Sequence, residues 1–196
     1  MTDVKTKVFR KAEILEQAAR LFLERGFKST SVRDIAAAVG IEASSLYSHI
    51  KSKEDILVLL CDACAERYDA ALTNIMDQAG IPRKEQLKQI LSFHIDNAFL
   101  DPTSSTVFSD EWKNLPAERI EKFLLDRKMY ENKWQAVIQD CINEGNIRAG
   151  DPTVIMNTLI SSVRWIHHTK RKYTEEERSA VKKTILNLLF EGLDKG

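Results

Sequence analysis

The sequence predicts an all-helical protein of nine helices. Apolar residues recur at the three- to four-residue spacing of amphipathic helices along most of the 196-residue chain. Glycine, proline and capping residues interrupt this spacing at intervals that suit single helices. No segment alternates apolar and polar residues as a half-buried strand would. We therefore expect an N-terminal helical domain over residues 1–51 and a larger helical domain over residues 52–196.

A first helix is expected from the start of the chain to about Arg25, where Gly26 ends it. Its beginning is basic. This segment is either a solvated helix start or an arm that reaches phosphates or a minor groove, and the sequence leaves both readings open. The basic residues are Lys5, Lys7, Arg10 and Lys11.

Residues 30–53 carry the most specific pattern, two short amphipathic helices joined by a tight turn. Ser31 can cap the first helix and form a capping box with Asp34. Gly40 falls where that helix must end, at a position that favours positive φ. The second helix turns Leu46 inward and leaves short hydrogen-bonding side chains on its outer face. This is the pattern of a helix-turn-helix whose second helix fits a DNA major groove.

Charge is distributed unevenly along a chain whose formal net charge is zero. Residues 1–53 carry ten lysines and arginines against six acidic residues, whereas the remainder carries 19 against 23. Attraction to phosphates depends on the local field and not on the total charge. The basic excess therefore lies on the region that contains the helix-turn-helix.

The composition narrows the class of protein further. Apolar residues make up 43% and charged residues 30% of the chain, which is typical of a folded globular protein. No apolar run reaches the roughly 18 residues of a membrane span. The polar N-terminus lacks the apolar core of a secretory signal, and three cysteines suit a reducing compartment. We expect a cytoplasmic protein that does not bind membranes.

The residues GFKSTSVRDIAAAVGIEASSLYSHIKSKEDIL resemble the N-terminal signature of TetR-type transcriptional regulators. The resemblance covers roughly residues 10–57 and departs from the family at Ile50, where phenylalanine is usual. It implies an all-helical homodimer with a DNA-binding end and a variable ligand-binding end.

The predicted DNA-facing residues come from the helix-turn-helix and its flanks. The resemblance implies that Tyr47, His49 and Lys53 hold phosphates, while Arg33 and the serines of the second helix face base edges. A serine hydroxyl donates or accepts, so it specifies a base poorly by itself. Glu42 either caps the second helix, which we favour, or accepts from cytosine. The full set is Thr30, Ser31, Arg33, Ser44, Ser45, Tyr47, Ser48, His49 and Lys53.

Breaks in the apolar spacing predict six further helices after this motif. Ser52 and Asp55 can form a capping box at the start of the first, a long helix. Thr174 can cap the last, whose first turn is acidic. The expected ranges are 53 to 76 or 79, 83–100, 106–113, 116–144, 152–169, and from 175 onward.

Cys61 and Cys64 lie three residues apart in the long helix. This spacing is also found in redox and metal sites, but no second cysteine pair or nearby histidine pair completes a zinc site. We favour two small, semi-buried apolar residues, with a thiol switch as the alternative.

Aromatic residues concentrate in the C-terminal domain, where the resemblance implies an effector cavity among helices. Ordinary core packing is the alternative. The segments EWKNLPAERIEKFLLDRKMYENKW and GNIRAGDPTVIMNTLISSVRWIHH resemble TetR-type regulators of fatty-acid and sterol breakdown, which respond to acyl-CoA thioesters. Polar side chains beside the aromatic ones would orient such a ligand. The predicted set is Phe93, His94, Asn97, Phe108, Trp112, Phe123, Arg127, Tyr130, Trp134 and Trp165.

The eighth and ninth helices are predicted to form a homodimer interface. Each is apolar over more of its circumference than one neighbour could cover, which favours a four-helix interface over a purely internal core. Two subunits would place two recognition helices on a palindromic operator. The predicted interface residues are Ile155, Leu159, Ser162, Ile166, Ile185, Leu188, Leu189 and Leu193.

Together these patterns predict a ligand-responsive repressor that a small apolar effector, such as an acyl-CoA, releases from its operator. No cofactor or metal is expected. The sequence has no Ser-His-Asp order, glycine-rich phosphate loop or HExxH motif, so we do not expect an enzyme. The alternatives are a DNA-binding regulator without a small-molecule effector, and a helical adaptor. An adaptor would not explain the basic N-terminal region.

Overall fold

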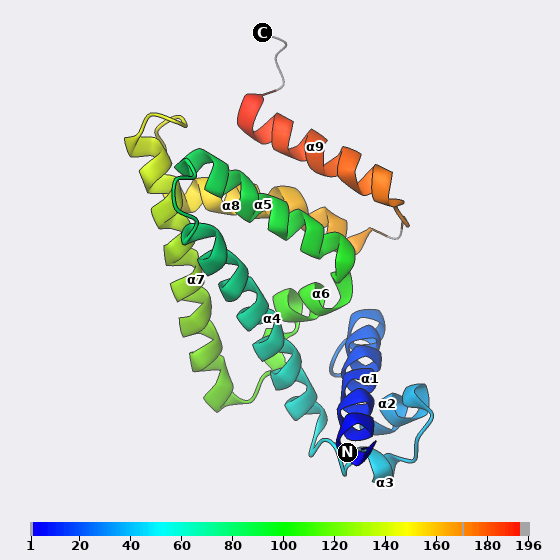
Figure 1. The fold of residues 1–196 in the computed structure, drawn as a ribbon. Helices are drawn as coiled ribbons and strands as arrows, with labels where there is room; N and C mark the ends of the chain where they lie inside the picture. Colours follow the sequence, from blue (N-terminus) through cyan, green and yellow to red (C-terminus); the bar gives the residue numbers. More distant parts are fainter. Residues whose placement is uncertain (1, 170, 193–196) are drawn as a thin grey trace. The chain divides into compact units, whose positions relative to one another are not determined.

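The computed structural model describes residues 2–169 and 171–192, and in these ranges it confirms an all-helical fold of nine α-helices and one 3-10 helix (Figure 1). None of the helices in these ranges is long and apolar enough to cross a membrane. The helices are α1 Thr2–Arg25, α2 Val32–Val39, α3 Ala43–Leu46, α4 Lys53–Met76, α5 Arg83–Leu100, α6 Pro102–Asp110, η1 Trp112–Asn114, α7 Ala117–Asn143, α8 Pro152–His168 and α9 Glu175–Glu191.

The chain packs into two compact units, each with its own apolar core. Unit 1 comprises Met1–Glu66 and Thr103–Leu125, and unit 2 comprises Arg67–Pro102 and Asp126–Gly196. Helices α4 and α7 therefore contribute residues to both. The predicted domain boundary between residues 51 and 52 divides the chain by function and not by compact packing. It therefore stays a prediction.

Unit 1 contains the helix-turn-helix in the predicted form. The Ser31 side chain accepts a hydrogen bond from the Asp34 amide, and the Asp34 carboxylate accepts one from the Ser31 amide at 2.8 Å. Gly40 ends α2 with a φ of 73°, in the left-handed region that glycine enters at little cost. Helix α3 is shorter than expected, because after Leu46 the chain continues in turns through His49. The backbone of the basic N-terminal segment is helical from Thr2 onward.

Two helix starts depend on their first residues. The Ser52 hydroxyl accepts from the Asp55 amide at 3.1 Å, which is one of the two bonds of the predicted capping box. The prediction of a helix over residues 106–113 was wrong, because α6 already begins at Pro102. A proline at the first helical position needs no amide partner and has a helical φ, so the chain re-enters a helix directly after α5. Trp112–Asn114 then form the separate 3-10 helix η1.

In unit 2, helix α5 packs against both α8 and α9 (Figure 1). Side chains on its buried faces, such as Leu91 and Ile95, are fully covered. Asp151 caps α8 by accepting from the amides of Thr153 and Val154. Thr174 caps α9 through a capping box, as predicted.

The apolar residues predicted for the dimer interface fall on different faces of α8 and α9. Leu159, Ile166 and Ile185 are buried in the core of unit 2. The prediction was wrong for these three, because α5 covers that side of both helices. Leu188 is 44% exposed, and Leu193 lies outside the described residues. The remaining predicted residues, Ile155, Ser162 and Leu189, are half-buried.

A set of five ring-bearing residues around His94, which we call the His94 cluster, occupies unit 2. The His94 imidazole stacks on Trp134 with ring centroids 4.8 Å apart, and the His94 Nε2 lies 2.7 Å from the Tyr130 hydroxyl. Burial, and to a smaller extent the nearby charge of His167, lowers the pKa of His94 to about 3. The imidazole is therefore neutral at physiological pH. The cluster consists of Tyr68, Phe93, His94, Tyr130 and Trp134.

Replacing His94 with phenylalanine should reduce the acid sensitivity of folding. The imidazole of the unfolded chain binds a proton near pH 6.5, whereas the folded state resists protonation down to about pH 3. Acidification between these values therefore favours the unfolded state. From pH 7 to pH 5, the free energy of unfolding should fall by about 1–2 kcal/mol more in the wild type than in His94→Phe, measured by urea denaturation.

Tyr130→Phe is the matched control, because it removes the same hydrogen bond but retains the imidazole. This variant should keep the acid sensitivity of the wild type. An identical pH dependence in the wild type and in His94→Phe would contradict a neutral, enclosed imidazole.

Candidate DNA-binding and effector sites

The outer face of the helix-turn-helix is polar and exposed. Leu46 anchors α3 in the core of unit 1, with 1% of its surface exposed, which turns the neighbouring side chains outward. Arg33 is exposed on α2, and His49 is half-buried. Tyr47 is 54% exposed and places a large ring with a hydroxyl on this surface. The other exposed residues of the predicted set are Ser31, Ser44, Ser45 and Ser48.

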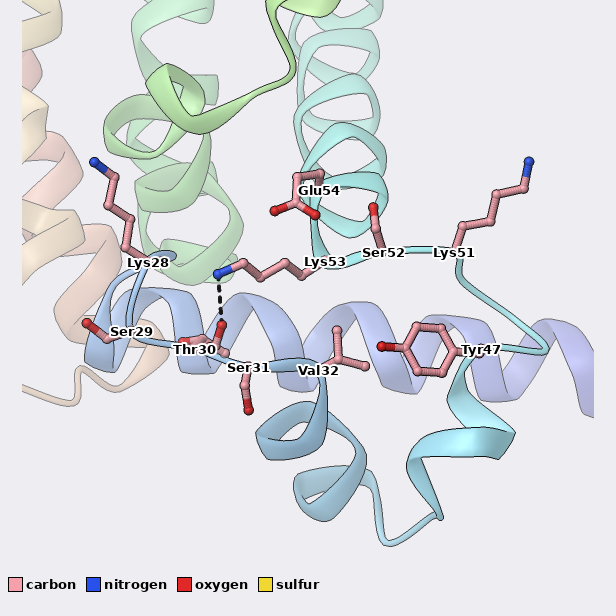
Figure 2. Close-up of a pocket in the computed structure, with 10 residues that line it drawn as sticks. All are labelled: Lys28, Ser29, Thr30, Ser31, Val32, Tyr47, Lys51, Ser52, Lys53 and Glu54. Carbon is pink, nitrogen blue, oxygen red and sulfur yellow. Dashed lines mark hydrogen bonds between the residues drawn. The ribbon is translucent and has the colours of Figure 1, made fainter.

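A concavity of about 410 Å³ adjoins this face, between the starts of α2 and α4 (Figure 2). Lysine ammonium groups, serine hydroxyls and the positive ends of two helix dipoles all favour a phosphate at such a position. Figure 2 shows Lys28 and Lys51 extending at its opposite sides. The lining residues are Lys28, Ser29, Thr30, Ser31, Val32, Tyr47, Lys51, Ser52, Lys53 and Glu54.

Six lining residues were not in the predicted set. They are Lys28, Ser29, Val32, Lys51, Ser52 and Glu54. The basic excess of residues 1–53 included both lysines, but it could not say which lysines share a surface. The start of α4 returns to the loop before α2, and that contact between residues more than 20 positions apart forms the concavity.

Thr30 is not an exposed DNA-facing residue, and this part of the prediction was wrong. Only 1% of its surface is exposed, and its hydroxyl lies 2.9 Å from the Gly26 carbonyl and 3.3 Å from the Leu21 carbonyl. The Gly26 carbonyl follows the end of α1 and has no helical partner, so a buried hydroxyl there satisfies it. Thr30 therefore stabilises the loop that leads into α2.

Lys53 is also engaged within the protein. Its ammonium donates to the Thr30 carbonyl at 3.0 Å (Figure 2). It also donates to the Phe27 carbonyl at 3.0 Å and lies 4.4 Å from the centre of the Phe27 ring. A cation is favourable beside the carbonyls at the C-terminal end of a helix, the negative end of its dipole. The ammonium has three N–H groups, so one donor remains beyond these two bonds. The predicted phosphate contact of Lys53 stays a prediction.

Glu42 precedes α3 at the N-cap position but makes no side-chain capping bond. Our preference for a capping role was therefore wrong. Effective caps have short side chains, such as serine or aspartate, that reach the amides of the first turn. Glu42 is exposed on the same face as the recognition serines.

The ten residues predicted for an effector pocket do not form one cluster. Phe108, Trp112 and Phe123 belong to unit 1, where they pack on its core. Trp112 stacks on Phe123 with ring centroids 5.4 Å apart, and Phe108 meets Phe123 edge-on. For these three the alternative of ordinary core packing describes the structure, because α6, η1 and the start of α7 close over α1 and α4.

Five predicted effector residues do come together in unit 2. Phe93, His94, Tyr130 and Trp134 lie in the His94 cluster, and Asn97 donates to the Tyr68 hydroxyl at 2.7 Å. Tyr68 was missed by the sequence analysis, since it lies on α4 away from the other aromatic residues. The Trp134 indole N–H is buried and has no hydrogen-bond partner among the described residues. A buried donor without an acceptor is costly, so this N–H is suited to a ligand oxygen.

The last two predicted effector residues lie on the surface. Arg127 is exposed and pairs with Glu131 one helical turn later, at 3.0 Å. Trp165 is 46% exposed on α8. Neither contributes to the His94 cluster, because each belongs to the outer face of its helix.

The thiols do not form a reactive or metal-binding site. Cys61 and Cys64 are each 2% exposed, and burial raises the pKa of Cys61 to about 12. A thiol switch requires the thiolate, which burial disfavours. Among the described residues no group of three or more His, Cys, Asp or Glu side chains is arranged to hold a metal ion. These findings support the interpretation of the pair as small apolar residues.

Two family models match this chain. The model of bacterial regulatory proteins of the tetR family matches residues 14–60, which contain the helix-turn-helix. The model of the tetracyclin repressor-like C-terminal domain matches residues 80–193, more than half of the chain.

Individual relatives agree with these models. The HTH-type transcriptional repressor KstR2 of Mycobacterium tuberculosis H37Rv is 29% identical over 158 residues, which cover 80% of this chain and 78% of the relative. The solved structure of ketosteroid transcriptional regulator KstR2 of Mycobacterium tuberculosis has a TM-score of 0.85 at 25% identity, covering 95% of this chain and 96% of that one. The structure of AibR in complex with isovaleryl coenzyme A and operator DNA has a TM-score of 0.80 at 25% identity, covering 92% and 98%.

The two matched models, the all-helical fold and the exposed polar face of α3 lead to one conclusion. The chain belongs to the TetR family of bacterial regulatory proteins, and it is a ligand-responsive, DNA-binding transcriptional repressor.

Proposed function

We propose that this repressor binds a palindromic operator as a homodimer, with one α3 in the major groove of each half-site. The observation that carries this proposal is the exposed polar face of α3 next to the lysine-lined concavity. The protein would act in the cytoplasm. There it would block transcription by occupying its operator, without catalysing a reaction.

The side chains divide into two roles on DNA. Arg33, Ser44 and Ser45 are exposed on the helix-turn-helix and would reach base edges, where an arginine can bond guanine through two donors. Lys28 and Lys51 flank the concavity and would contact phosphates, which give affinity without sequence information.

An exposed stripe on α8 and α9 supports the homodimer. Val154 and Trp165 are 62% and 46% exposed, and Thr158 and Ser161 lie between them at helical spacing on the same face. On α9, Leu188 continues an exposed line that includes Ala180 and Thr184. Two copies of this stripe would bury large apolar side chains that water otherwise surrounds, which favours association.

We further propose that an acyl-CoA or another long apolar ligand is the effector, and that its acyl part binds at the His94 cluster. The apolar rings and the neutral imidazole suit an uncharged group, and the free Trp134 N–H could donate to a thioester carbonyl. AibR, a structural relative, has been solved with isovaleryl coenzyme A and operator DNA. The effector would release DNA only through a difference in affinity between the two states of the repressor. The alternative is a regulator that has no small-molecule effector.

Lys51→Ala should weaken binding to operator DNA and reduce its dependence on salt. Loss of one phosphate contact lowers the slope of log K against log salt concentration by about one. The measurement is fluorescence anisotropy with labelled duplex over a range of salt concentrations. Lys128→Ala removes an exposed charge of the same sign from α7 and should leave the slope unchanged. An unchanged slope for Lys51→Ala would remove this residue from the interface.

Trp165→Glu should convert the dimer into monomers, because a carboxylate would face the partner's apolar stripe. Analytical ultracentrifugation measures this directly. Operator affinity should also fall, by about 100-fold or more, since the two half-sites would no longer be bound together. Leu125→Glu is the control, because Leu125 is a 61% exposed apolar residue of α7 that is not part of the stripe. A Trp165→Glu variant that remains dimeric would exclude α8 as the interface.

Isovaleryl-CoA or palmitoyl-CoA should lower the affinity for operator DNA, whereas coenzyme A alone should not. Trp134→Phe keeps an aromatic ring but removes the indole N–H. It should weaken binding of the thioester about fivefold, as expected for the loss of one hydrogen bond, without changing the affinity for DNA. Trp112→Phe in unit 1 serves as the control. If neither thioester shifts DNA binding, the acyl-CoA part of the proposal fails.

A further inference from the structure

The loop between α1 and α2, residues 26–31, determines where the helix-turn-helix begins. It turns at Gly26, whose φ of 82° lies in the left-handed region, and it ends at the N-cap Ser31. Its carbonyls are bound by Lys53 from α4, as described above. The Gly26 amide donates to the Phe22 carbonyl of α1, and the next amide, that of Phe27, is bound from another part of the sequence.

The partner of the Phe27 amide is Glu111, which lies 84 residues further along the chain. The amide donates to Glu111 Oε1 at 3.2 Å. The same oxygen lies near Gly26, where an added Cβ would meet it at 3.8 Å. The second carboxylate oxygen, Oε2, accepts from the Asn114 side chain at 2.6 Å. One carboxylate therefore joins the α1–α2 loop to η1.

Glu111 is itself held firmly. It lies between α6 and η1, and its amide donates to the Val107 carbonyl at 2.9 Å. Val107 is fully buried in the core of unit 1, and Leu115 at the end of η1 is buried as well. The carboxylate thus has a fixed position relative to the loop.

Charge acts in both directions at Glu111, since the Lys53 ammonium binds the carbonyl of Phe27, the same residue whose amide donates to Glu111. A carboxylate is unfavourable near the negative end of the α1 dipole, and in a DNA-binding unit it also repels phosphates. The hydrogen bond to the Phe27 amide is the favourable term, since an unpaired backbone donor in a half-buried loop is costly. The position of Glu111 is therefore best explained by what it holds.

We propose that Glu111 is a positioning residue for DNA recognition, whose carboxylate fixes the α1–α2 loop and thereby the start of α2 and the wall of the phosphate-binding concavity. The inference rests on the proposed binding of α3 and the concavity to operator DNA. Glu111 lies in the sequence matched by the C-terminal family model, residues 80–193, but in compact unit 1. It therefore makes the geometry of the helix-turn-helix depend on α6 and η1.

Glu111→Ala and Glu111→Gln separate the hydrogen bond from the charge. The carboxamide oxygen of Glu111→Gln can still accept from the Phe27 amide, and the Asn114 amide can turn so that its oxygen accepts from the new NH2 group. Glu111→Ala loses both bonds. Glu121→Ala is the charge control, because Glu121 is an exposed acid of the same unit.

Two measurements on the full-length protein test the proposal. The first is hydrogen exchange of the Phe27 amide without DNA, which should be about tenfold faster in Glu111→Ala and unchanged in Glu111→Gln. The second is affinity for a duplex that the wild-type protein has selected from a random-sequence pool. Glu111→Ala should bind about tenfold more weakly with an unchanged salt slope, whereas Glu111→Gln and Glu121→Ala should bind at least as tightly as the wild type.

The proposal is overturned if Glu111→Ala binds DNA as tightly as the wild type or more tightly, since removal of a repelling charge by itself predicts tighter binding. It is also overturned if hydrogen exchange of the Phe27 amide is as slow in Glu111→Ala as in the wild type. The same holds if Glu111→Gln loses affinity for DNA although its Phe27 amide still exchanges slowly. Thermal unfolding of each variant separates these effects from a general loss of stability. If the wild type selects no duplex, the proposed operator binding fails at that step, and the exchange measurement still decides whether Glu111 holds the loop.

Discussion

The DNA-binding unit depends on how the backbone between α1 and α2 is satisfied. Residues 26–31 follow one helix and precede another, and the helices supply partners only at the ends of this loop, for the Gly26 amide and the Ser31 carbonyl. The Thr30 hydroxyl, the Lys53 ammonium and the Glu111 carboxylate supply them instead. These groups come from the loop itself, from α4 and from the junction of α6 with η1. The direction in which α2 and α3 leave the core follows from three side chains that bind no DNA base.

The same arrangement explains why a protein without net charge can bind DNA. The lysines of the N-terminal region are not equivalent. Lys53 binds carbonyls of its own chain, while Lys28 and Lys51 remain exposed at the concavity. A carboxylate so close to this surface is tolerated because it satisfies a backbone donor. Affinity for phosphates and rigidity of the loop are thus provided by different residues.

The C-terminal region combines two kinds of interior. In unit 1, Trp112 and Phe123 complete the core that supports the helix-turn-helix. In unit 2, the His94 cluster brings polar groups among aromatic rings, and burial keeps its imidazole neutral. A neutral interior with one free indole donor favours a ligand with an uncharged oxygen over an anion. Because α4 and α7 contribute residues to both units, they provide continuous backbone between these interiors.

The sequence by itself determined most of the helices, most of their caps and the family, because these depend on local spacing and on residues a few positions apart. The capping boxes at Ser31 and Thr174 are examples. Only the tertiary structure decided which neighbour covers each apolar face. It buried Leu159 and Ile185 under α5, left Trp165 exposed, and assigned the aromatic residues to two cores. Helical periodicity shows that a face is apolar, but its partner is set by contacts between residues far apart in the chain. For the same reason the bond between Glu111 and Phe27, 84 residues apart, could not be read from either segment.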